Sequence, residues 1–167
     1  MMNIYLIGMM GSGKSTVGKI LSKKLDMPFL DLDHYIEVKN QKTVSEIFKE
    51  DGESRFREIE SDALSNITDS NVIVACGGGI ILDKANRNQL KSSGKVFLLK
   101  ASISELTARL QTVINRPLLH GKQIEEEINR IWGDRKSMYQ DTAHITVNTD
   151  HQTPEQIAEE IFNYINP

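Results

Sequence analysis

The chain contains 167 residues, of which 39% are hydrophobic and 26% are charged, and this length and composition predict one globular domain, residues 1–167, with a buried core. They exclude a disordered tail, a collagen-like repeat and a disulfide-stapled mini-protein, and the lone cysteine, Cys76, favours a reducing compartment. The 20 basic and 23 acidic residues leave a net charge of −3, which argues against non-specific nucleic-acid binding.

Five short apolar runs alternate along the chain with longer amphipathic stretches. Runs this short, rich in Val, Ile and Leu, are typical of strands buried on both faces. The stretches between them are long enough for crossover helices, so the alternation predicts a parallel sheet with helices on both sides. The runs are residues 4–7, 28–32, 72–75, 96–99 and 145–147. The first is far shorter than the roughly 20 apolar residues of a membrane-spanning helix, and no Lys or Arg precedes it, so we expect a cytoplasmic protein without membrane contact.

Capping residues mark three of the helix starts. Thr43 with Glu46, and Ser102 with Glu105, fit the capping-box pattern, in which each residue caps a backbone N–H of the other. The segment 153–156 places a proline at the first helical position, ahead of an apolar stripe. These three positions are predicted to begin helices.

The strongest functional signal lies between the first apolar run and the first helix. Residues 8–15, GMMGSGKS, match the pattern G-x-x-x-x-G-K-[ST] in the strand–loop–helix context that this motif requires. The glycines let backbone N–H groups wrap around phosphate oxygens, and the helix adds its positive N-terminal end. We expect Lys14 to reach the β- and γ-phosphates and Ser15 to ligate Mg²⁺. A glycine-rich turn that fits by chance is the weaker alternative.

The carboxylate that would hold Mg²⁺ does not follow the third apolar run, so another segment must supply it. The run 72–75 ends in Cys76 and three glycines rather than in the Asp of many ATPases, and the N-K-x-D motif of GTPases is missing from the sequence. Residues two apart in a strand share a face, so Asp31 and Asp33 are expected to point together from the carboxyl end of the second strand. One carboxylate would hold a water of the Mg²⁺ shell and the other an acceptor hydroxyl. An equal alternative is that Asp33 only caps the next helix.

Three further features indicate an anionic acceptor. Glu60 lies three residues after Arg57 and can hold its guanidinium, although a solvated surface ion pair is the commoner arrangement. Arg135 falls on an apolar helical stripe, where a cation needs a partner or an anion unless it snorkels from the edge. Guanidinium groups bind carboxylates bidentately, so the two arginines suit an acceptor with a carboxylate. Residues 77–79, all glycine, let a ligand approach the backbone, or else form a flexible loop.

A loop is predicted at residues 112–122, which hold Arg116-Pro117 and Gly121 between two helical patterns. We expect this loop to be mobile. An arginine on a closing loop can stabilise the charge of a transferring phosphoryl group, and closure excludes water. An exposed loop cation without a role is the alternative for Arg116.

Together these motifs resemble the shikimate kinase family along nearly the whole chain. The matching elements, in family order, are residues 8–16, 29–33, 52–53 with Phe56, Arg57 and Glu60, 77–79, 116–119, and Arg135 with Tyr139. The resemblance implies a three-layer α/β P-loop fold, with a five-stranded parallel sheet in the order 2-3-1-4-5, flanking helices and a mobile lid at residues 112–123. It also implies Mg²⁺-dependent transfer of the ATP γ-phosphoryl to the 3-hydroxyl of shikimate, on the route to chorismate and the aromatic amino acids.

The resemblance further implies roles for individual residues. The catalytic residues would be Lys14, Asp33 and Arg116, and the metal would be held by Ser15 and, through water, by Asp31. Shikimate would bind in the region 32–61 and beyond it, to Asp33, Arg57, Gly78, Gly79 and Arg135. ATP would bind Gly11, Ser12, Gly13, Lys14, Ser15, Thr16, Arg109, Arg116, Gln152 and Pro154, with Arg109 packed on the adenine. One departure is Cys76, where Thr or Ser is common in the family.

Two alternatives to this function remain at the level of sequence. A related P-loop kinase could act on another small acceptor, such as gluconate, although a carboxylate on a cyclic triol fits two arginines and Asp33 better. A non-catalytic nucleotide-binding module is the other, and intact Lys14, Asp33 and Arg116 argue against it. We expect a monomer, because no long apolar stripe is left over after the predicted core.

Overall fold

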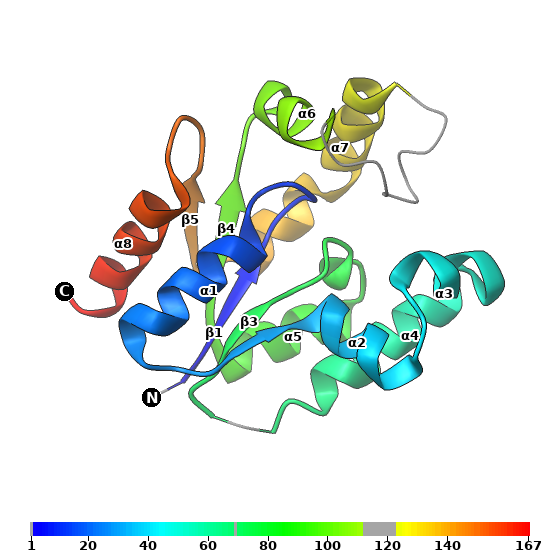
Figure 1. The fold of residues 1–167 in the computed structure, drawn as a ribbon, viewed down its shortest axis with the longest axis horizontal. Helices are drawn as coiled ribbons and strands as arrows, with labels where there is room; N and C mark the ends of the chain where they lie inside the picture. The colour runs from blue at the N-terminus through cyan, green and yellow to red at the C-terminus, as the bar shows by residue number, and fades with distance from the viewer. Residues whose placement is uncertain (1, 69, 112–122) are drawn as a thin grey trace.

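A parallel five-stranded sheet forms the middle layer of the structure, a computed structural model that describes residues 2–68, 70–111 and 123–167 (Figure 1). Its strands lie in the order β2-β3-β1-β4-β5, and each neighbouring pair is parallel. The predicted strand order is therefore confirmed. The strands are β1 (Asn3–Ile7), β2 (Phe29–Asp31), β3 (Ile73–Ala75), β4 (Gly94–Lys100) and β5 (Ile145–Asn148).

Helices connect the strands and cover both faces of the sheet. They are α1 (Lys14–Leu25), α2 (Leu32–Asn40), α3 (Val44–Glu50), α4 (Gly52–Ser65), the 3₁₀ turn η1 (Ile80–Leu82), α5 (Lys84–Ser93), α6 (Ile103–Gln111), α7 (Ile124–Thr142) and α8 (Pro154–Ile165). None of the helices in the described ranges combines the length and the hydrophobicity that a bilayer-spanning segment requires.

The pleat of the central strand divides the core between two faces of the sheet. Leu6 of β1 is buried with Val17 of α1 and Ile161 of α8, and these two helices lie side by side (Figure 1). Tyr5, one residue earlier, is buried on the other face with Ile128 of α7. Successive strand residues point to opposite faces, so this alternation fixes the two helical layers that the sequence predicts.

The two edge strands differ from the prediction of strands buried on both faces. All residues of β1 and β3 are buried, as predicted, whereas all three residues of β2 are half-buried and only Val147 is buried in β5. An edge strand has a neighbour on one side only, so helices cover it less completely.

Two of the three predicted helix starts are confirmed in full. Thr43 forms a reciprocal capping box with Glu46, and α8 begins at Pro154 behind a second box. The box predicted at Ser102 forms only in half: its hydroxyl accepts from the Glu105 N–H at 3.3 Å, but its own N–H donates to an Asp150 oxygen at 2.8 Å. The prediction was wrong in this half because Asp150, in the loop after β5, accepts from the Ser102 N–H, while the Glu105 carboxylate pairs with Arg109.

Candidate active site

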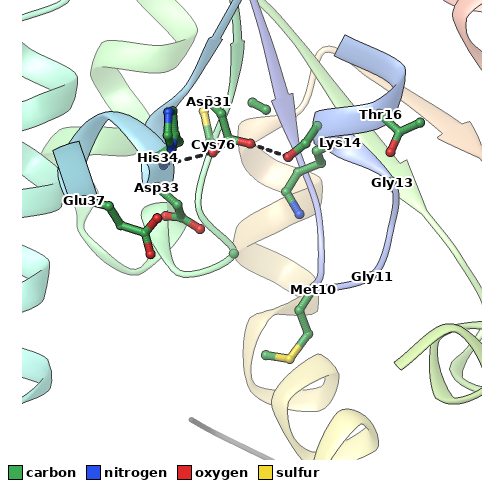
Figure 2. Close-up of a pocket in the computed structure, with 13 residues that line it drawn as sticks. Met10, Gly11, Gly13, Lys14, Thr16, Asp31, Asp33, His34, Glu37 and Cys76 are labelled. Atoms are coloured by element: carbon green, nitrogen blue, oxygen red, sulfur yellow. Dashed lines mark hydrogen bonds between the residues drawn. The ribbon is translucent and has the colours of Figure 1, made fainter. Parts of the chain in front are cut away.

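A cavity of about 450 Å³ opens at the carboxyl ends of the strands, between the P-loop and the start of α2 (Figure 2). Figure 2 shows Asp31, Asp33 and Glu37 across the cavity from Gly11 and Gly13. The cavity is lined by Met10, Gly11, Gly13, Lys14, Ser15, Thr16, Asp31, Asp33, His34, Glu37, Ala75, Cys76 and Gly78. The phosphate-binding motif and both predicted carboxylates therefore face one space.

The P-loop takes a backbone path that only glycine adopts easily. Gly11 and Gly13 have φ angles of 79° and 92°, in the left-handed region. Gly13 is also the N-cap of α1 and brings no side chain to cap the helix. The first N–H groups of α1 are thus left without a side-chain cap, and the helix dipole adds positive charge there. This arrangement suits an anion such as a phosphate.

Lys14 lies folded over the P-loop. Its ammonium donates to the carbonyl oxygens of Gly8 and Met9 at 2.9 Å each, and to the Ser12 hydroxyl at 3.4 Å. The cation is therefore held in the concavity of the loop, on the wall of the cavity. A phosphate bound in that concavity would meet this charge.

Ser15 and Asp31 meet at the base of the cavity, where the hydroxyl of Ser15 donates to the carboxylate of Asp31. The same carboxylate caps α2 by accepting from the His34 N–H at 3.2 Å. Hydroxyl and carboxylate oxygens are the ligands that Mg²⁺ prefers, so the pair fits the predicted metal role. The capping function, left open above for Asp33, belongs to Asp31.

Asp33 reaches the cavity by a different route from the one predicted. Strand β2 ends at Asp31 and α2 begins at Leu32, so Asp33 lies in the first helical turn and not two residues further along the strand. The prediction that Asp31 and Asp33 share one face of a strand is therefore wrong, although both carboxylates do line the same cavity. A tight strand-to-helix junction, without an intervening loop, brings them together.

A second, smaller cavity of about 90 Å³ adjoins the first on the side of α3, α4 and α7. Its walls combine the predicted cations with apolar side chains. It is lined by Met10, Asp33, Val44, Phe48, Phe56, Arg57, Glu60, Gly77, Gly78, Gly79 and Arg135. Met10, Asp33 and Gly78 line both cavities, so these three residues mark the place where the two spaces meet.

Arg57 is held rigidly on one wall of the smaller cavity. Its guanidinium donates to Glu60 at 2.8 Å and to Glu53 at 3.1 Å. The side chain of Glu60 is only 1% exposed, so the solvated surface pair considered above is excluded. The guanidinium also lies 5.8 and 5.2 Å from the ring centroids of Phe48 and Phe56, within the range of cation–π contacts.

Glu60 is an unusual acid in this site. Burial raises its pKa to about 7, against the opposing effect of the Arg57 cation. One carboxylate oxygen is bonded to Arg57, while the other, Oε1, is buried without a hydrogen-bond partner in the described part of the chain. Loss of hydration disfavours the charged form of a carboxyl group. The attraction and hydrogen bond of Arg57 are the largest effects that favour the ionised form of Glu60.

Arg135 of α7 also lines the smaller cavity and is 8% exposed. Its guanidinium donates to the carbonyl oxygen of Gly78 at 3.3 Å. A buried arginine that lines a cavity does not snorkel to solvent, so that alternative is excluded. The predicted grouping of Arg57, Arg135 and residues 77–79 is confirmed as a grouping in space.

The predicted adenine-side residues lie around the loop that follows β5. Arg109 of α6 donates to the carbonyl oxygens of Gly11 at 3.3 Å and Thr149 at 3.1 Å, and so connects the P-loop with this loop. Gln152 donates to the Asn148 carbonyl at 2.7 Å, and Pro154 is the first residue of α8. Arg116 lies outside the described residues, and so does the rest of the predicted lid, 112–123, except Gln123.

Sequence reasoning missed the apolar wall of the smaller cavity. Val44 and Phe48, one turn apart on α3, and Met10 of the P-loop line it together with Phe56. The spacing of Val44 and Phe48 on one helical face was a visible signal, but the pattern of core-facing residues is the same. Tertiary packing, which places α3 beside α4, turns this face into a wall of the smaller cavity.

Comparisons with known proteins agree with this geometry. A family model described as shikimate kinase matches residues 10–166. Shikimate kinases of Sulfurihydrogenibium sp. and Thermodesulfovibrio yellowstonii are 44% and 42% identical, over 99% and 96% of this chain and 98% and 93% of their own lengths. A shikimate kinase from Acinetobacter baumannii, solved in complex with shikimate, has a TM-score of 0.96 and 35% identity, and covers 99% of this chain and 93% of its own. A deoxyadenosine kinase from M. mycoides, at 19% identity and a TM-score of 0.65, shares the fold alone. The chain belongs to the shikimate kinase family.

Proposed function

We propose that this protein transfers the γ-phosphoryl group of ATP to the 3-hydroxyl of shikimate, giving shikimate 3-phosphate and ADP. The observation that carries the proposal is the junction of the two cavities at Met10, Asp33 and Gly78. One cavity has the P-loop, the lysine and the helix N-terminus that suit a nucleoside triphosphate. The other has two arginines that suit a carboxylate and an apolar wall that suits a carbocyclic ring.

Each side chain then has a distinct task. Arg57 and Arg135 bind the carboxylate of shikimate, and Gly78 and Gly79 border the ring. Asp33, at the junction, accepts a hydrogen bond from the 3-hydroxyl and so directs its oxygen at the γ-phosphorus. The oxygen–phosphorus bond forms as the bond from that phosphorus to the bridging oxygen of ADP breaks, and the hydroxyl proton passes to Asp33. Positioning and charge stabilisation account for the catalysis.

The remaining groups act on ATP. Lys14 and residues 11–16 hold the phosphates, and Arg109, Gln152 and Pro154 border the adenine. We place Arg116, on the lid 112–123, on the transferring phosphoryl group. Ser15 would hold Mg²⁺ directly and Asp31 through water, which the hydrogen-bonded oxygen pair supports. When bound, the ion supplies positive charge to the β- and γ-phosphates.

We also propose that the protein acts as a monomer. Of the exposed large apolar side chains among the described residues, Val38 lies on α2 and Leu82 in η1, while Met2 and Tyr164 line one surface cavity. One such pair is far smaller than the roughly 800 Å² per partner that a stable interface buries. Size-exclusion chromatography with light scattering tests this proposal.

A coupled assay of ADP release tests the function. Wild-type protein is given ATP, Mg²⁺ and either shikimate, gluconate or a nucleoside monophosphate, with Lys14→Met as the inactive control. We expect release that depends on shikimate and on Lys14. Turnover with gluconate in preference to shikimate, or ATP binding without turnover on any acceptor, would contradict the proposal.

A further inference from the structure

The carbonyl oxygen of Gly78 accepts hydrogen bonds from two side chains of α7. The hydroxyl of Tyr139 donates to it, and so does Nη1 of Arg135 at 3.3 Å. A carbonyl oxygen has two lone pairs, so these two donors use its full capacity. Arg135 and Tyr139 are four residues apart and therefore on the same helical face.

Tyr139 is a fixed donor. Its side chain is fully buried, and its ring stacks on Trp132 with 6.0 Å between centroids. Burial raises the pKa of its hydroxyl to about 12, so the hydroxyl keeps its proton at neutral pH. The stacking on Trp132 and the retained proton leave this group little freedom.

Gly78 sits where a small shift matters. A Cβ placed on it would lie 3.7 Å from the Gly8 carbonyl oxygen, from the Met10 nitrogen and from the Tyr139 hydroxyl. The half-buried residue thus lies within van der Waals range of the P-loop and α7, and it lines both cavities. Movement of its carbonyl would change the border between the nucleotide and the acceptor spaces.

We propose that Tyr139 is a positioning residue of the acceptor site, whose hydroxyl fixes the Gly78 carbonyl and, through that shared acceptor, the guanidinium of Arg135. The inference rests on the proposed function, which assigns Arg135 and Gly78 to shikimate. Without the hydroxyl, the half-buried Gly78 carbonyl keeps a single side-chain donor. Arg135 is then drawn toward that carbonyl and away from the carboxylate of the substrate.

The test compares Tyr139→Phe with a matched variant, Tyr5→Phe. Tyr5 is also buried in the core, and its hydroxyl bonds to Ser93 at 2.9 Å and Asn3 at 3.2 Å, none of which lines either cavity. In Tyr139→Phe we expect the KM for shikimate to rise roughly tenfold, the effect of one buried hydrogen bond, while the KM for ATP stays within about twofold. Tyr5→Phe should lower the Tm by about as much as Tyr139→Phe does. It should leave the KM values for shikimate and ATP unchanged.

Amide hydrogen exchange of the ligand-free protein separates this inference from the proposed function. Residues 77–79 should exchange faster in Tyr139→Phe than in wild type or Tyr5→Phe, whatever the substrate is. Faster exchange there in a protein that does not act on shikimate would support the positioning role and overturn the proposed function. Unchanged exchange at residues 77–79, or an equal rise of shikimate KM in Tyr5→Phe, would overturn the positioning role.

Discussion

Gly79 lies directly against the guanidinium of Arg57, so that a Cβ added at Gly79 would overlap it. Arg57 is in turn tied to Glu60 by a hydrogen bond of 2.8 Å. The third glycine of the 77–79 segment thus leaves the space in which the arginine is held. The absence of a side chain at Gly79 therefore serves the proposed acceptor site as well as the backbone of the loop.

Gly79→Ala is therefore expected to impair shikimate binding. The added methyl displaces Arg57, and the KM for shikimate should rise by roughly 10-fold or more, as for loss of one charge-assisted hydrogen bond. Steady-state kinetics with each substrate varied in turn measures this, and the KM for ATP should not change.

Gly133→Ala is the matched control for that substitution. Gly133 lies within α7, and a Cβ there would meet no atom within 4 Å. Alanine is the better helix former, so the variant should be more stable by about 0.5–1 kcal/mol, with unchanged kinetics. An equal rise of the shikimate KM in both glycine variants would contradict the role of Gly79.

Glu60→Gln is expected to change how stability depends on pH. In the folded protein burial raises the pKa of Glu60 from 4.5 to about 7. The folded state therefore favours the protonated acid, and this contribution to stability is present below the unfolded pKa and lost as pH rises through about 7. The difference in unfolding free energy between wild type and Glu60→Gln should fall by about 3 kcal/mol between pH 4.5 and 8. Urea titrations across this range measure it.

The activity of wild type should follow the opposite trend. Ionised Glu60 holds Arg57, so the shikimate KM should rise as pH falls below about 7, the raised pKa of Glu60. Asp33 and Arg135 also act on this carboxyl, Asp33 raising its pKa and Arg135 lowering it. In Glu60→Gln the KM should be higher at pH 8 and nearly flat with pH. A variant that kept the wild-type pH profile would show that another group titrates.

Asp31→Asn is expected to raise the concentration of Mg²⁺ at half-maximal rate, by roughly tenfold or more, because an amide oxygen is a weaker partner for the ion's shell than a carboxylate. The Asn side chain still accepts from the His34 N–H, so the cap of α2 is kept. A Mg²⁺ titration at fixed ATP measures the effect. Asp134→Asn, on the exposed side of α7, is the control. An unchanged requirement for Mg²⁺ would place the metal elsewhere.

The parts of this fold that local patterns encode were predictable from the sequence. Buried strands are recognisable as short apolar runs. The P-loop glycines belong to a motif whose spacing follows from phosphate binding. The junction at Asp31 was not predictable in the same way. Whether Asp33 continues the strand or enters a helix depends on which side chain caps α2, and both residues are chemically able to cap.

Tertiary contacts decided the other differences. An arginine and a glutamate three residues apart look the same on an exposed and on a buried helical face, and only the packing of α4 beside Gly77 buries Glu60. The Ser102 N–H donates to Asp150, in a loop that is distant in sequence, and not to its local partner Glu105. Long-range competition of this kind leaves no trace in local spacing.

His144 should make the protein sensitive to mild acid. Its Nδ1 accepts from the Val96 N–H at 3.0 Å, where β4 meets β5, and only a ring with unprotonated Nδ1 can accept there. Partial loss of hydration lowers the pKa of His144, although the residue is exposed, and Lys95 and Lys91 lower it further. The stability it contributes is therefore present above the unfolded pKa of 6.5 and lost as pH falls through the folded value.

His144→Asn replaces the ring nitrogen with an amide oxygen that does not titrate. Its urea midpoint should fall less than that of wild type between pH 7 and pH 5, because the Val96 N–H keeps its acceptor. His151→Asn is the control: this exposed residue has a φ of 58°, which asparagine tolerates, so the substitution removes a histidine at no cost in backbone strain. If both variants track wild type through this range, the acid sensitivity does not arise at His144.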